Sequence, residues 1–156
     1  MNKYVVYTKE LGKISTNNVE DFIFLTLHRT DGPAFIEYNT DYGTKSFEEW
    51  WVDRKKHRTD GPAVVSYDTN NQPLLQVYYK DDKVHRIGGP ARIYHDNGRI
   101  TTEEWLVDDN LHRLDGPAII NYKDDGSKEI SFYIHNRLMS YTEFENAILQ
   151  KKMNIL

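Results

Sequence analysis

The sequence has no cysteine among its 156 residues. That absence excludes disulfide bonds, thiolate catalysis and cysteine-ligated zinc. Long apolar runs are also missing, because the start, MNKYVVYTKELGK, places only short apolar pieces among charges. We therefore expect neither a secretory signal peptide nor a membrane-spanning segment. The expected protein is soluble and cytoplasmic, with no membrane as partner.

Basic residues are not in excess. The chain carries 20 Lys and Arg against 24 Asp and Glu, which gives a formal net charge of -4 at pH 7. Binding to a phosphate backbone requires a basic stripe, so a nucleic acid is not the expected partner. Glycine-rich phosphate loops, serine elbows and HExxH stretches are also missing, and no cofactor is predicted.

Aromatic residues are abundant instead. They make up 13% of a chain that is only 38% apolar in total, and each ring can bury roughly 150–250 Å². Length and composition together indicate a single domain over residues 1–156, with a core built largely on rings.

One seven-residue motif occurs four times, as HRTDGPA at 28–34 and 57–63, HRIGGPA at 85–91 and HRLDGPA at 112–118. The histidines that open these motifs are 29, 28 and 27 positions apart, and such a near-constant period marks a repeat protein. We predict an N-terminal cap at 1–27, repeats at 28–56, 57–84, 85–111 and 112–139, and a C-terminal helix at 140–156.

The segment that follows each motif alternates in polarity with period two, as AFIEY, AVVSY, ARIYH and AIINY show. That alternation indicates a half-buried strand. A turn-forming stretch such as DNG at 96–98 then precedes a returning strand. Each repeat is thus a β-hairpin that must stack on its neighbours. The predicted fold is mainly β, an elongated twisted antiparallel sheet of about four stacked hairpins with an N-terminal strand cap and a short C-terminal helix.

Both ends have the character of caps. KYVVY at 3–7 alternates as a strand, and FIFLTL at 22–27 is so apolar that we expect it inside the sheet. Ser140 followed by Glu143 makes a capping box for a helix that would cover the open sheet edge. The apolar residues that then fall on one helical face are Phe144, Ala147 and Ile148.

The recurring His, Arg and Asp could be catalytic or structural. Equivalent residues in successive hairpins lie about 10 Å apart, whereas zinc ligands lie within about 3–4 Å of one another. Gly88 replaces the acid in the third repeat while the rest of the motif persists, which is inconsistent with a required catalytic acid. We predict no enzyme, no catalytic residue and no metal ligand. In the structural reading, Gly eases the strain before Pro, Pro starts a strand, Asp forms the turn, and Arg bonds to the carboxylate or to carbonyls. The structural residues are His28, Arg29, Asp31, His57, Arg58, Asp60, His85, Arg86, His112, Arg113 and Asp115.

One residue in each repeat lies six positions before the histidine of the next motif, or at the matching position of the last repeat. These residues form a row that comprises Trp51, Tyr79, Leu106 and Tyr133. An exposed row of this kind could anchor a partner protein or stack on sugars. Equally, the terminal segments could cover this face, or the rings could pair across strands. Our leading hypothesis is a non-enzymatic binding module that uses this row to engage a protein. The alternative is a carbohydrate-binding or virion-associated structural protein.

The four units resemble the HRxDGPA-type β-hairpin repeats of giant-virus and bacteriophage proteins, which are described as variants of the MORN repeat. The resemblance covers roughly residues 22–150 and includes the ending HNRLMSYTEFENAIL, which is similar to the turn and helix that close such arrays. It implies an elongated sheet with a binding role. If the origin is viral, it also implies an adaptor or inhibitor of a host or defence protein in the host cytoplasm. The array departs from the regular pattern at Gly88, at Gln72 and Pro73, and before His28.

Overall fold

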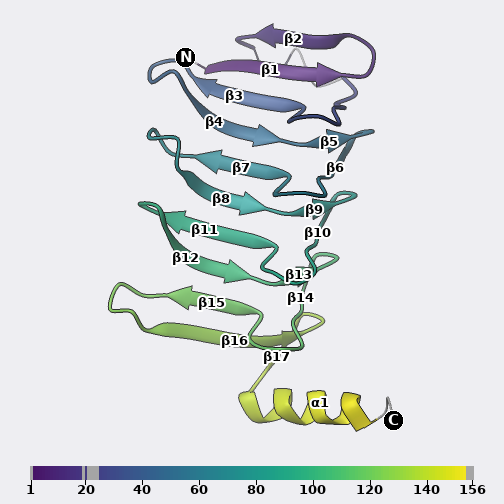
Figure 1. Cartoon of the computed structure of the whole chain (residues 1–156), viewed down its shortest axis with the longest axis vertical. Helices are drawn as coiled ribbons and strands as arrows, with labels where there is room; N and C mark the ends of the chain where they lie inside the picture. Colours follow the sequence, from purple (N-terminus) through teal and green to yellow (C-terminus); the bar gives the residue numbers. More distant parts are fainter. Residues whose placement is uncertain (1, 19, 21–24, 154–156) are drawn as a thin grey trace.

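A computed structural model of the chain describes residues 2–18, 20 and 25–153. Its main feature is an 11-stranded sheet in the order β17-β16-β15-β12-β11-β8-β7-β4-β3-β1-β2. Each hairpin pairs antiparallel with the next one along the chain, so the sheet grows into the elongated array of Figure 1. The predicted mainly β fold is confirmed.

The strands of the main sheet carry the body of each repeat. They are β1 (Asn2–Thr8), β2 (Gly12–Thr16), β3 (Phe35–Asn39), β4 (Thr44–Glu49), β7 (Val64–Tyr67), β8 (Pro73–Val77), β11 (Arg92–Asp96), β12 (Arg99–Glu104), β15 (Ile119–Tyr122), β16 (Lys128–Ile134) and β17 (Arg137–Met139). Two-stranded ladders lie at one end of the hairpins (Figure 1). These are formed by β5 (Trp51–Val52) with β6 (Lys55–Lys56), β9 (Tyr79–Lys80) with β10 (Lys83–Val84), and β13 (Leu106–Val107) with β14 (Asn110–Leu111).

The turns have the backbone geometry that their residues favour. In the third repeat Asn97 and Gly98 have φ angles of 49° and 75°, which suit a tight hairpin turn. In the second repeat, where Gln72 and Pro73 break the pattern, Asn71 takes the left-handed conformation with a φ of 61°. Each short ladder also closes on two consecutive residues with positive φ. These pairs are Asp53 with Arg54, Asp81 with Asp82, Asp108 with Asp109, and, at the β16–β17 turn, His135 with Asn136.

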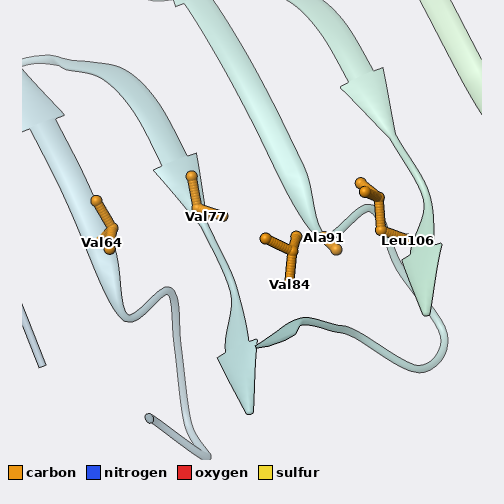
Figure 2. Packing of buried hydrophobic residues seen from close by; sticks show 5 residues of the cluster. All are labelled: Val64, Val77, Val84, Ala91 and Leu106. Carbon is orange, nitrogen blue, oxygen red and sulfur yellow. The ribbon is translucent and has the colours of Figure 1, made fainter. Parts of the chain in front are cut away.

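The hydrophobic core joins the sheet to the short ladders. Val64 and Val77 of the sheet cluster with Val84, Ala91 and Leu106 from segments further along the chain, as Figure 2 shows. A single hairpin does not contain all of these residues, so the second and third repeats share this core. The alanine that ends every motif has no exposed surface, at positions Ala34, Ala63, Ala91 and Ala118.

The N-terminal cap extends the sheet as predicted for residues 3–7. Strand β1 pairs with both β2 and β3. Of the apolar stretch 22–27, residues 22–24 lie outside the described residues, while Leu27 bridges to Thr8 of β1.

The C-terminal helix α1 (Tyr141–Met153) packs against β16 and β17. The capping box is confirmed, because Glu143 accepts a 2.8 Å hydrogen bond from the Ser140 backbone N and donates its own N to the Ser140 Oγ at 3.3 Å. Phe144 is buried, with its ring centroid 4.7 Å from that of Phe132. Across the part of the chain that the structure describes, no helix has the length and apolar character needed to span a membrane.

Candidate interaction surface

Each motif arginine lies on an aromatic ring supplied by the preceding segment. The Arg58 Cζ is 3.8 Å from the centroid of the Trp50 ring, and its Nη1 donates a 3.2 Å hydrogen bond to the Pro62 carbonyl. These contacts hold the guanidinium in place. The same stack forms between Arg29 and Tyr7, Arg86 and Tyr78, and Arg113 and Trp105.

The motif glycine closes the other side of the guanidinium. A Cβ built on Gly61 would lie 2.8 Å from the Arg58 Cζ, far inside the ordinary carbon–carbon contact of about 3.5–4.0 Å. The strain before proline alone favours glycine at this position. The structure shows a further constraint, since the arginine fills the place that any side chain would need.

Three of the four arginines also bind the motif acid. Arg58 Nε donates to Asp60 Oδ1 at 2.8 Å. The equivalent distances are 2.8 Å for Arg29 with Asp31 and for Arg113 with Asp115. In each pair, the hydrogen bond from the guanidinium holds the pKa of the carboxyl below its usual value. The expected structural bonds of Arg to the carboxylate and to a carbonyl are both present.

The motif histidines reach forward to the turn near the end of their own repeat. The Nδ1 of His57 lies 3.0 Å from Asp81 Oδ1, and that of His85 lies 3.0 Å from Asp108 Oδ1. His28 accepts a 3.1 Å bond from the Asp53 backbone N. His112 instead accepts from the His135 backbone N at 3.3 Å. Each imidazole is therefore engaged by a different turn, and within the described ranges no three His, Asp or Glu side chains gather closely enough to hold a metal ion.

A tie between successive repeats, formed by the turn residues, was not predicted from the sequence. Asp82 Oδ1 accepts a 2.7 Å bond from the Lys56 backbone N, while the Asp82 N donates to the Lys56 carbonyl at 3.0 Å. The paired acids of the turns 81–82 and 108–109 were the available signal. The same pair of bonds joins Asp109 to Val84 and Asn136 to Leu111.

Two adjoining hollows lie between successive motif loops. The hollow between the second and third loops has a volume of about 460 Å³ and is lined by residues that include Arg58, Tyr79 and Arg86. The one between the first and second loops has a volume of about 420 Å³. The two share His57, Arg58, Thr59 and Asp60. Ile87 lines the first hollow and is 76% exposed. Charged groups, rings and an exposed aliphatic side chain are thus combined on one surface.

The aromatic row proposed from the sequence is not one continuous exposed surface. Leu106 is only 5% exposed and belongs to the core cluster, so its assignment as a contact residue is corrected. Trp51 and Tyr79 are half-buried, and the Lys56 Nζ lies 5.3 and 5.4 Å from their ring centroids. Tyr133 is also half-buried. Of the four, only Tyr79 is among the residues that line the first hollow.

A tyrosine and a glutamate bond to one another on the main sheet at two equivalent positions. Tyr67 Oη donates to the buried Glu48 at 2.9 Å, and Tyr122 Oη donates to Glu103 at 2.5 Å. Burial raises the pKa of Tyr67, and the bond to Glu103 raises the pKa of Tyr122 to about 12. These phenols therefore remain protonated donors at neutral pH. His95 occupies the equivalent place between them, and burial lowers its pKa.

Comparisons with family models, with curated proteins and with solved structures found no match to this chain.

Proposed function

We propose that this chain is a non-enzymatic β-repeat module that binds a protein partner through the surface of its motif loops. The observation that carries the proposal is the pair of adjoining hollows that share the loop at His57–Asp60. Protein interfaces are enriched in Arg and in aromatic residues, and their anchors sit beside pockets. Arg58, Tyr79 and the exposed Ile87 supply those features on this surface.

The geometry of the motif supports binding over catalysis. An active site needs several groups that converge on one reacting atom. Here each His bonds to a different turn, while Arg58 is stacked on Trp50 and bonded to Asp60. The resemblance to viral HRxDGPA repeats extends the proposal to an adaptor or an inhibitor of a host or defence protein in the cytoplasm. The sugar-stacking alternative has less support, because Lys56 lies close to the rings of Trp51 and Tyr79.

The proposal is tested by capture from a candidate host extract, followed by titration of the purified partner. Ile87→Asp places a charge on the hollow, and should weaken binding by about tenfold or more if this side chain is an interface anchor. The matched control is Ile130→Asp, since Ile130 is 51% exposed in β16 and does not line either of these hollows. The proposed surface would be contradicted if both variants weakened partner binding equally, or if neither variant weakened it.

A further inference from the structure

The third repeat leaves its motif arginine without a carboxylate. Arg86 stacks on Tyr78 at 3.9 Å and donates from Nη1 to the Pro90 carbonyl at 3.1 Å, as its counterparts do. The residue two positions later is Gly88 instead of Asp, and no carboxylate lies within ion-pair distance of Arg86 among the described residues. The Nε that bonds to a carboxylate in the other three repeats is thus left to solvent or to a ligand.

The vacated place is open. Gly88 is exposed and has a φ of 78°, and a Cβ built on it would meet no atom within 4 Å. Asp31, Asp60 and Asp115 do not have positive φ, so the third loop differs in backbone course as well as in side chain. Arg86 faces the hollow of about 460 Å³ described above.

The charges that line this hollow are unbalanced. Its basic side chains are Arg58, Lys80 and Arg86, and the one acidic side chain among its lining residues is Asp60, which is already bonded to Arg58. Tyr79 and the exposed Ile87 add apolar surface at its rim. Such a site favours an anionic group attached to an apolar neighbour.

We propose that Arg86 binds the carboxylate of an acidic side chain on a protein partner, in the place that the motif Asp fills in the other repeats. The existing pairs give the geometry, with the Nε donating to one carboxylate oxygen at 2.8 Å. The guanidinium is already fixed between the Tyr78 ring and Gly89, where a Cβ would lie 2.9 Å from the Arg86 Cζ. A ligand therefore meets a preorganised donor, which lowers the ordering cost of binding. The inference rests on the proposed function only for the source of the carboxylate.

The test follows the Nε–Hε resonances of the motif arginines by NMR as sodium acetate is added to the full chain at constant ionic strength with chloride. We expect a saturable shift at Arg86, with an apparent affinity at least about tenfold higher than at Arg58 or Arg113, where an internal carboxylate competes. Equal responses at all three arginines would overturn the inference. A tighter response to phosphate than to acetate would also overturn it, since the site would then not be selective for carboxylates.

Two variants should change the acetate response in opposite directions, one by creating a site and the other by removing it. Asp60→Ala removes the exposed competitor beside the same hollow, and should create an equivalent acetate response at Arg58. Gly88→Asp restores the motif spacing and should abolish the response at Arg86. Because Gly88 has a left-handed backbone, which Asp adopts less readily than Gly, Arg86→Lys is the second loss variant. It keeps the charge but removes the Nε donor, and the amides of Ile87 and Gly88 then report on binding.

These measurements need no partner, so they separate the two proposals. If acetate fails to select Arg86, the carboxylate site is wrong even when a partner is captured through Ile87. If acetate selects Arg86 but Ile87→Asp leaves partner binding unchanged, the carboxylate site stands and the proposed interface is wrong.

Discussion

Substitution of Gly61 by Ala should destabilise the fold through Arg58, although the new methyl group is small. Gly61 does not have a positive φ, so alanine avoids the strain of the left-handed region. The added Cβ would lie 2.8 Å from the Arg58 Cζ, about 1 Å inside normal contact. The guanidinium must therefore leave its stack between Gly61 and the Trp50 ring.

The magnitude follows from what the guanidinium loses. Its stack on Trp50, at 3.8 Å, contributes about 0.5–1 kcal/mol at a partly exposed site. Its bond to the Pro62 carbonyl, at 3.2 Å, contributes about 1.5–3 kcal/mol because the donor is charged. Alanine recovers about 0.4–1 kcal/mol by restricting the unfolded chain. We expect a net loss of about 1–3.6 kcal/mol in the free energy of unfolding, measured in urea with linear extrapolation.

The double-mutant cycle with Arg58→Ala decides whether this reasoning is correct. In that background the methyl group has no guanidinium to displace, so Gly61→Ala should be neutral or slightly stabilising. An undiminished cost in the Arg58→Ala background would refute the argument. The other repeats supply a graded control, since the closest contact is 2.5 Å at Gly32 and 3.2 Å at Gly116. The cost should therefore be larger at Gly32 and smaller at Gly116.

Three further predictions concern the turn residues at 54 and 135 and the C-terminal helix. Arg54→Asn should stabilise the fold by about 0.5–1.5 kcal/mol in urea unfolding. Asn suits the φ of 67° at this position and supplies the side-chain acceptor found at the equivalent places in later repeats. An unchanged unfolding midpoint would show that this acceptor adds no stability. Burial first, and His135 next, lower the pKa of His112, so the unfolded chain binds more protons and stability falls as pH drops below about 6.5. His135→Asn should raise the pKa of His112 in an NMR titration while leaving it below the usual value, and should lessen that acid loss; an unchanged pKa would contradict the coupling. Phe144→Ala should release α1 from the sheet, since Phe144 is the one buried residue of this helix. Amide hydrogen exchange in α1 should become fast while the sheet stays protected. Retained protection in α1 would show that other contacts hold the helix.

The repeat period, the hairpins and the capping box were predictable because their signals are local. Strand alternation, turn residues and the pairing of Ser140 with Glu143 all lie within a few positions of one another. The ties that stack one repeat on the next were not predictable in the same way. The Asp82 carboxylate bonds to an amide 26 positions earlier, and its local surroundings look the same as those of a solvated turn.

The assignment of Leu106 to the row of contact residues was wrong for a related reason. Alternation in a strand shows that Leu106 lies on the face opposite Trp105, but it does not show what lies against that face. In the structure the short ladders contribute to the same core cluster as the sheet, so Leu106 belongs to the cluster that contains Val64 and Val77. The motif glycine is a similar case, because a glycine before proline already has a local explanation that hides the contact with Arg58.

The direction of these contacts explains why both ends of the array must imitate a repeat. Each motif takes its ring from the segment before it, so the first arginine, Arg29, needs the cap residue Tyr7 at 3.9 Å. Each motif also takes hydrogen bonds from the turn after it, so the last histidine, His112, needs the turn at 135–136. The cap at 1–27 and the segment that closes on α1 thus complete the first and last motifs. Shortening the array by one repeat should preserve folding only if the new first arginine keeps a ring and the new last histidine keeps a turn.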